Sequence, residues 1–442
     1  MHNYAETIHA LQAQGVHSIL TQFCDIHGVA KGKLVPLDKL QDWVEVGAGF
    51  AGPSIWGTGL PRMGARSEYY GRVLPETLQA LPFMPGVARA VCDGFAGGEA
   101  LDTCSRQVLK AAIAKLDARG WRLWVGIEPE FFLLREVQGT WEVADAQDRL
   151  DKPSYDLKSI HRNAAWLEDM RSTLVELGFD LQQIDHEDAC GQYEINYRFD
   201  HALAAADRYM LFKLTAHAVA ERHGMVFSAM PKPLAHAPGS GLHFHLSITD
   251  AEGRAVFADP LGALGLSTEG HQFAAGLLHH ADALAALCAP TVNSYKRLAV
   301  SDSASGTTWS PVWKAYGDNN RTCLVRVVDG RLEWRLPDPS CNIYAAIAAT
   351  LVAGLDGIEA ALPVPTPVTD DLYQRAQRGG VMPSTLPVDL RAALLALEQD
   401  TVLRFGVGES FCTQFLAIKR AEWAAFAQHI SPWEMARYAD FF

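Results

Sequence analysis

Four short segments of the chain alternate between apolar and polar residues with a period of two. They cover residues 127–131, 192–196, 242–246 and 331–335. Successive side chains of a β-strand point to opposite faces, so each segment predicts a half-buried strand with one polar face. The polar positions hold Glu128 and Glu130, then Glu194, then His243 and His245, and finally Glu333 between Arg331 and Arg335.

Longer segments repeat apolar residues with the period of an amphipathic helix. The first is residues 1–15, and short apolar strands follow it at Ser18–Cys24 and Lys33–Val35. After a glycine-rich break at 94–98, Asp102 and Thr103 are candidate N-cap residues for a helix over 106–118. Further helices are predicted over residues 164–177, 200–223, 271–287, 341–361, 385–399 and 413–429.

The order of these elements predicts an α+β protein with two domains. The N-terminal domain spans residues 1–102, and a larger domain that mixes helices and strands spans residues 103–442. At 442 residues the chain is long enough to bury a sizeable core in the larger domain.

The composition, 49% hydrophobic and 20% charged with a net charge of −13, is typical of a globular protein. No block of consecutive basic residues occurs, so nucleic acid is not an expected partner. The N-terminal segment lacks the pattern of a signal peptide, and the longest apolar stretch, 343–355, is too short to cross a membrane. Eight scattered cysteines without a CxxC pair are typical of reduced thiols. We therefore expect a cytoplasmic protein that does not bind membranes.

The polar strand faces, together with Glu187, carry five glutamates and one or two imidazoles. Such an oxygen-rich set favours Mg²⁺ or Mn²⁺ over zinc. Without cations these carboxylates would repel one another. We expect the four strands to line one cavity that holds two or more of these ions.

The arginines of the last third of the chain include Arg297, Arg321, Arg326, Arg331 and Arg335. Guanidinium groups bind carboxylates and phosphates through paired hydrogen bonds. Metal ions combined with several arginines supply the charge neutralisation that phosphoryl transfer needs. No GxxxxGK[ST] motif occurs, so any nucleotide would have to bind on a different scaffold.

Six motifs in order along the chain resemble those of the glutamine synthetase superfamily. They are G-I-E-P-E-F (126–131), H-E-D-A-C-G-Q-Y-E-I-N (186–196), G-S-G-L-H-F-H-L-S (239–247), N-S-Y-K-R-L (293–298), N-N-R-T (319–322) and R-L-E-W-R-L-P-D (331–338). The resemblance implies the glutamine synthetase fold, in which a β-grasp-like N-terminal domain precedes a catalytic domain with a curved antiparallel sheet flanked by helices. It also implies a homo-oligomer, usually a dodecamer of two stacked hexameric rings, with active sites shared between neighbouring subunits.

The resemblance further implies a reaction and roles for individual residues. ATP phosphorylates the γ-carboxylate of glutamate, and an amine then attacks this γ-glutamyl phosphate to give a γ-glutamylamide, ADP and phosphate. One metal ion is expected on Glu130, Glu187 and Glu194, and a second on Glu128, His243 and Glu333. The expected ATP-binding residues are His245, Ser247, Arg321, Arg326 and Arg331. Gly239, Arg297 and Arg335 are expected to bind glutamate, and Arg297 and Arg321 to act in catalysis.

Two positions depart from the pattern of glutamine synthetases proper. Ala51 stands where they carry an aspartate, and Ser303 stands where they carry a glutamate in a flap over the site. An ammonium ion in a closed pocket needs anionic partners, so these losses favour an amine with an apolar substituent and place Ala51 beside it. Asp302 is a candidate base for removing the proton of the amine.

Three stretches also resemble the branch of glutamate–methylamine ligases: F-A-G-P-S-I-W-G-T-G-L (50–60), S-G-T-T-W-S-P (305–311) and W-E-M-A-R-Y (433–438). Methylamine is therefore the favoured amine. The alternatives within the family are a glutamine synthetase that uses ammonia, or a ligase for a larger amine such as a polyamine, ethanolamine, isopropylamine or an aniline. Outside this activity, the alternatives are a metal-dependent hydrolase, which would turn over without ATP, and a non-catalytic family member.

Overall fold

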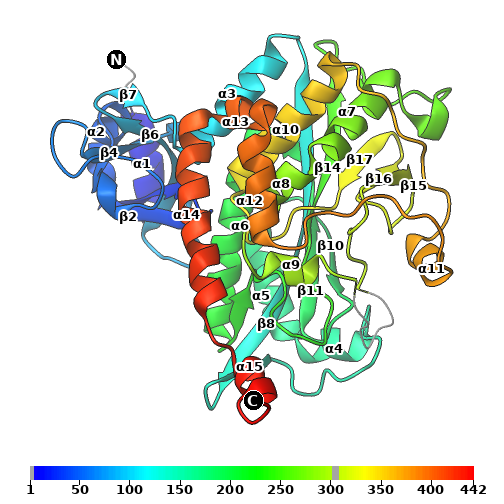
Figure 1. Ribbon diagram of the computed structural model, residues 1–442. Coiled ribbons are helices and arrows are strands. Elements are labelled where there is room, and N and C mark those ends of the chain that lie inside the picture. Colours follow the sequence, from blue (N-terminus) through cyan, green and yellow to red (C-terminus); the bar gives the residue numbers. More distant parts are fainter. Residues whose placement is uncertain (1–3, 301–307) are drawn as a thin grey trace.

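The computed structural model describes residues 4–300 and 308–442, and two β-sheets organise the chain (Figure 1). The candidate base Asp302 and the flap position Ser303 lie outside the described residues. The smaller sheet belongs to the first 100 residues, and the larger one to residues 122–334.

The smaller sheet has the strand order β2-β1-β6-β4-β3, and the short strands β5 and β7 also pair with β6. The neighbours β1 and β6 are parallel, while the other pairs are antiparallel. The strands are β1 (Ser18–Cys24), β2 (Ala30–Pro36), β3 (Ala48–Ala51), β4 (Glu68–Val73), β5 (Gln79–Ala80), β6 (Val87–Ala96) and β7 (Glu99–Ala100).

The larger sheet has the order β10-β11-β8-β14-β17-β16-β15, with β9, β12 and β13 pairing with the long strand β8. It is antiparallel as expected, except that β15 and β16 are parallel. Its strands are β8 (Arg122–Val137), β9 (Thr140–Val143), β10 (Leu181–His186), β11 (Gln192–Tyr197), β12 (Asp200–His201), β13 (Val226–Ser228), β14 (Leu242–Thr249), β15 (Tyr316–Asp318), β16 (Val325–Val328) and β17 (Arg331–Trp334).

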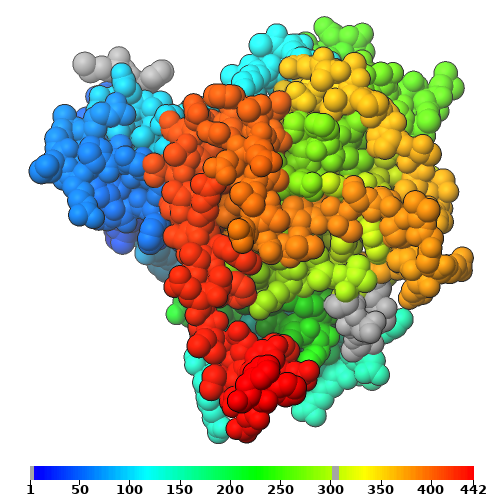
Figure 2. Space-filling view, in the orientation of Figure 1, coloured from blue at the N-terminus to red at the C-terminus, as the bar shows by residue number. Residues whose placement is uncertain are grey.

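Helices pack around α10, which is buried over nearly its whole length and forms the centre of the core. The helices are α1 (Ala5–Ala13), α2 (Leu40–Glu45), α3 (Ser105–Asp117), α4 (Leu157–Arg162), α5 (Ala164–Glu176), α6 (Ala202–Arg222), α7 (Thr268–His279), α8 (Ala281–Cys288), α9 (Ser294–Arg297), α10 (Ile343–Glu359), α11 (Leu372–Gln377), α12 (Leu390–Gln399), α13 (Thr401–Val407), α14 (Glu409–Gln428) and α15 (Pro432–Tyr438). Figure 2 shows α14 as a band between the N-terminal part and the rest of the molecule.

Two details of the helix predictions were wrong. Helix α3 begins at Ser105 with Cys104 as N-cap, because the hydroxyl of Thr103 donates instead to the carbonyl of Thr58 at 2.9 Å. The segment 271–287 forms two helices, α7 and α8, which meet at His280. There the imidazole lies 2.6 Å from Asp400 and 3.0 Å from Asp356.

All eight cysteines are free thiols, as their spacing predicted. Within residues 4–300 and 308–442, no helix combines the length and apolar character that a membrane span requires.

Candidate active site

The four alternating segments lie in β8, β11, β14 and β17, and pairing brings their polar faces together. His243 of β14 is the register partner of Glu128 on β8, and His245 is the partner of Glu333 on β17. The Nδ1 atom of His243 lies 3.6 Å from carboxylate oxygens of both Glu128 and Glu333. Ligating atoms of these three residues all lie within 4.8 Å of one another.

A second group of carboxylates forms where β10 meets β11. Ligating atoms of Asp185, Glu187 and Glu194 also lie within 4.8 Å of one another. Glu130 lies between the two groups, because it pairs with Glu194 and approaches His243 Nε2 at 3.8 Å. The sequence analysis missed Asp185, although its i, i+2 spacing to Glu187 would place both on one face of a strand.

The two groups differ in how their charge is balanced. Burial would raise the pKa of Glu128, but hydrogen bonds from His243 and His245 outweigh burial and hold it well below its usual range. Burial and then the charge of Glu130 raise the pKa of Glu187 to about 8. Burial, followed by the charges of Glu128 and Glu187, also raises the pKa of Glu194.

These carboxylates fit divalent cations. The donors are oxygens with one imidazole, which is the ligand set that Mg²⁺ and Mn²⁺ prefer. Burial and then neighbouring carboxylates raise the pKa values of Glu187 and Glu194, and no basic side chain of the described residues is among the causes that lower them. A bound cation would therefore stabilise the charged form of this group.

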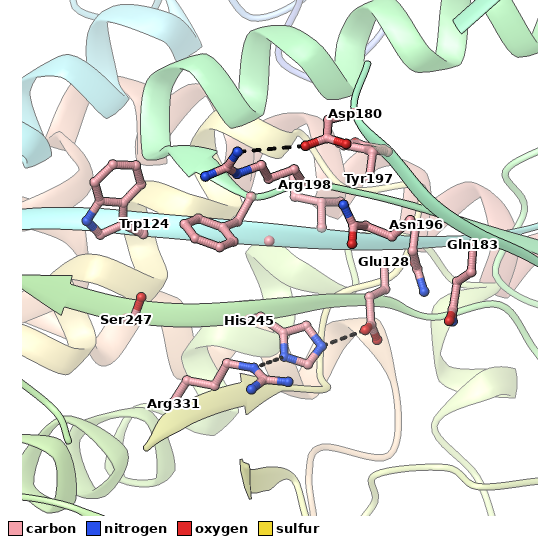
Figure 3. Close-up of a pocket in the computed structure, with 14 residues that line it drawn as sticks. Trp124, Glu128, Asp180, Gln183, Asn196, Tyr197, Arg198, His245, Ser247 and Arg331 are labelled. Atoms are coloured by element: carbon pink, nitrogen blue, oxygen red, sulfur yellow. Dashed lines mark hydrogen bonds and ion pairs between the residues drawn. The ribbon is translucent and has the colours of Figure 1, made fainter. Parts of the chain in front are cut away.

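The first group opens into a cavity of about 570 Å³, whose lining includes three of the predicted ATP-binding residues, His245, Ser247 and Arg331 (Figure 3). Arg331 Nε donates to His245 Nδ1 at 3.1 Å, and His245 Nε2 lies 2.7 Å from Glu128. The cavity opens beside residues 126–129 of β8, because pairing with β11 starts only at Glu130.

Aromatic residues that the sequence analysis did not assign also line this cavity. Trp124 stacks on His201 with ring centroids 3.8 Å apart, and Phe199 meets Trp124 edge to face at 5.7 Å. These rings give the cavity an apolar wall beside its charged residues.

The other two predicted ATP-binding arginines, Arg326 and Arg321, differ in how close they lie to the first carboxylate group. Arg326 Nη1 binds Glu333 at 2.5 Å, so it already touches the first carboxylate group. Arg321 is exposed and borders a separate surface depression with Asn319 and Asn320. Its carbonyl oxygen accepts a hydrogen bond from Arg335.

The predicted glutamate-binding residues, Gly239, Arg297 and Arg335, line a second, narrow cavity beside Glu130 and Glu187. Both arginines are 95% buried. At Gly239 a side chain is excluded, because a Cβ atom would lie 2.5 Å from the carbonyl of Pro231 and 2.8 Å from Arg297 Cγ.

Residues 308–311 close one side of this second cavity. Arg335 Nη2 donates to the carbonyl of Trp309 at 3.3 Å, and the indole Nε1 of Trp309 donates to Asp188 at 2.5 Å. The hydroxyl of Tyr373 donates to the carbonyl of Ser310 at 2.9 Å.

Ala51 lies apart from the other described residues of the predicted site. It is exposed at the end of β3 in the smaller sheet, and it does not border either cavity among the described residues. In Figure 1 that sheet lies across the molecule from β16 and β17.

Comparison with known proteins places this geometry in context. The family described as "Glutamine synthetase, catalytic domain" matches residues 102–438. The chain is 46% identical to the glutamate–methylamine ligase of Methyloversatilis universalis over 437 residues, or 98% of each chain. It is 36% identical to a glutamine synthetase of Rhizobium leguminosarum bv. phaseoli, covering 95% of this chain and 96% of the relative.

Solved structures give the same picture. A structure described as a GmaS/ADP complex has a TM-score of 0.92 and 39% identity, and the match covers 98% of this chain and 99% of that one. A structure described as apo GmaS without ligand has a TM-score of 0.91 and 38% identity.

Proposed function

The chain belongs to the glutamine synthetase family, and from this premise we propose that it is an ATP-dependent ligase that joins the γ-carboxylate of glutamate to a small alkylamine. Methylamine is the preferred amine, and the products are a γ-glutamylamide, ADP and phosphate. The observation that carries the proposal is the convergence of two carboxylate groups and two buried arginines on adjoining cavities.

We expect this reaction to require two or more Mg²⁺ or Mn²⁺ ions. Glu130, Glu187 and Glu194 would hold one ion, and Glu128, His243 and Glu333 the other, while the position of Asp185 adds it to the first set. When bound, such ions neutralise the phosphate charge of ATP and polarise the phosphoryl group.

The side chains around ATP act on its phosphates. Arg331 and His245 lie together at the cavity wall, and Arg326 lies on the far side of Glu333. Their role is to fix the phosphate oxygens and to offset the negative charge that transfer of the terminal phosphoryl group redistributes. Ser247 lines the same cavity. Arg321 borders a separate depression on the surface, and in this proposal it completes the set of ATP-binding residues.

The buried arginines hold glutamate. Arg297 donates to the carbonyls of Leu336 and Arg335, which fixes its guanidinium group at the narrow cavity. Arg335 is held by Glu333 at 3.2 Å. The two guanidinium groups orient the bound glutamate so that its γ-carboxylate faces ATP. Because Gly239 has no side chain, the glutamate can approach the backbone at this position.

The assembly is a homo-oligomer, a dodecamer of two stacked hexameric rings in the cytoplasm. Two observations support an assembly: Ala51 is exposed away from the site, and apolar side chains at the C-terminal end are exposed. These are Ile430, Trp433, Met435, Tyr438, Phe441 and Phe442. In this assembly Ala51 lines the amine site of a neighbouring subunit, and Asp302 is the base. We also propose that the N-terminal domain ends at residue 102 and that the catalytic domain begins at residue 103.

An amine panel tests the function. The full chain with glutamate, ATP and Mg²⁺ or Mn²⁺ is supplied with ammonia, methylamine, ethylamine or isopropylamine at equal concentration, and ADP and γ-glutamylamide are measured. We expect the highest kcat/KM with methylamine. Turnover with ammonia alone would identify a glutamine synthetase instead, and turnover without ATP would identify a hydrolase.

The metal ligands supply the matched variants for this assay. Glu333→Ala and Glu130→Ala should each lower kcat at least about 100-fold, because even outer residues of a metal site cost 10- to 100-fold. Glu252→Ala, on an exposed turn, is the control and should keep the wild-type rate. Full activity in either ligand variant would remove that residue from the metal site.

A further inference from the structure

Trp309 has no role in the function described so far, yet it borders the cavity where glutamate and the amine must meet. It lines that cavity together with Glu187, Asp188 and Arg335. Trp309 is 40% exposed, so part of the residue remains accessible to a bound molecule.

Both the indole ring and the backbone of Trp309 are held by hydrogen bonds. Its Nε1 donates to one oxygen of Asp188 at 2.5 Å, and the other oxygen of Asp188 accepts from Ser154. Its backbone has a left-handed φ of 50° and is held by Arg335 through the Trp309 carbonyl. A strained backbone conformation that neighbouring groups hold in place is typical of functional sites.

The chemistry of this corner suits an alkylammonium ion. Such an ion has N–H donors at one end and a methyl or larger alkyl group at the other. Asp188 offers carboxylate oxygens to the donors, while an aromatic face attracts a cation and covers its apolar substituent. Ammonium has no alkyl group and gains less from the ring.

We propose that Trp309 is the residue that selects the alkyl substituent of the amine, with its indole held against Asp188 so that the ring covers the methyl group. The inference rests on the proposed function and deepens it, since it names a residue of the same chain that sets amine choice. It differs from the role of Ala51, which would act from a neighbouring subunit.

The test measures kcat/KM for ammonia, methylamine and isopropylamine at saturating glutamate and ATP. Trp309→Ala removes the aromatic surface, so kcat/KM for methylamine should fall about tenfold. The value for ammonia should stay within roughly threefold. Isopropylamine should gain relative to methylamine, because the truncation leaves room for a larger substituent. Trp309→Phe retains an aromatic face and should keep the preference of the wild type within about threefold.

Two further variants distinguish a role of Trp309 in amine selection from a purely structural role. Asp188→Asn keeps an acceptor for the indole but removes the charge, so both amines should lose activity by the same factor and their ratio should not change. Trp141→Ala removes an exposed tryptophan of β9, away from both cavities, and should leave all values unchanged.

An unchanged ratio of methylamine to ammonia in Trp309→Ala would overturn the inference. So would a higher KM for glutamate with that ratio intact, because Trp309 would then act only by holding Arg335. In both cases the wild type still ligates amines, and the proposed function stands. Absence of ATP-dependent ligation in the wild type with every amine would remove the proposed function and this inference together.

Discussion

At the scale of single residues, the two carboxylate groups are balanced in different ways. Glu333 is 98% buried, yet its pKa is lowered, because His243, Arg335, His245 and Arg326 outweigh the effect of burial. Glu187 and Glu194 have only other carboxylates among the causes that follow burial in raising their pKa. Arg326 and Arg335 therefore offset part of the negative charge of the first group, whereas the second group depends more strongly on a bound ion.

This difference predicts how stability changes with pH. The pKa of Glu187 is raised to about 8 in the folded state. Between the usual pKa range of a glutamate and pH 8, this carboxyl group is therefore protonated in the folded protein and ionised in the unfolded protein. The folded state binds more protons there, so stability falls as pH rises through this window. We expect the melting temperature of metal-free protein to drop by about 5 °C or more between pH 5 and pH 8. Added Mg²⁺ or Mn²⁺ should restore it most at pH 8.

Thermal unfolding in EDTA and in excess metal measures this effect. Glu187→Gln removes the titrating group, so its melting temperature should vary less with pH and gain less from metal. Glu252→Gln changes an exposed glutamate and serves as the control. A metal-free protein that becomes more stable as pH rises would contradict the charge balance described here.

At the scale of elements, the alternating segments allowed the strands of the site to be predicted, because one buried face fixes which residues point the other way. The pairing of β14 with both β8 and β17 could not be predicted, since the alternation in each strand carries no information about its neighbours. For that reason His243 and Glu128 were expected together from a family resemblance, while Asp185 and Trp124 were missed. The helix boundaries were predicted to within a few residues, except where side chains such as His280 meet distant elements.

Helix α3 is tied to its neighbours by a buried ion network that the sequence did not predict. Arg106 binds Asp93 of β6 at 2.5 Å and Asp207 of α6 at 2.9 Å, and Tyr344 of α10 also donates to Asp207. The side chains of Arg106, Asp93 and Asp207 are only 8%, 5% and 13% exposed, so all three have little access to water. The network joins the smaller sheet to the core helices.

Removal of Arg106 should therefore destabilise the protein strongly. Arg106→Met removes the cation that the two aspartates share, although Asp93 keeps its pair with Lys110 at 2.6 Å. Removing one partner from a buried ion network of this kind costs about 3–5 kcal/mol. The midpoint of urea-induced unfolding should fall accordingly. Arg171→Met, which breaks an exposed pair with Glu168, should change stability by less than about 1 kcal/mol. Equal midpoints for the two variants would mean that the buried network adds nothing.

At the scale of the whole molecule, the main difference between the predicted site and the structure of a single chain is the position of Ala51. Its strand β3 lies at the end of the smaller sheet, and the metal-binding strands lie in the larger one. If Ala51 affects amine choice, its side chain must come from a second copy. A homo-oligomer built by repeating one interface would join the smaller sheet of each subunit to the larger sheet of the next.

Mixed assemblies test this arrangement directly. Glu333→Ala disables the larger sheet, and Ala51→Arg should disable the amine site by placing a positive charge beside an alkylammonium ion. Each variant alone should be inactive with methylamine. If sites are shared, co-expressed subunits form some sites that take Ala51 from one variant and Glu333 from the other. Random pairing in equal amounts gives such sites in roughly a quarter of positions, so about that share of wild-type activity should return. A mixed assembly of the same size, verified by mass and still inactive, would show that Ala51 serves no site in a neighbouring subunit, and the amine would then be chosen within one chain.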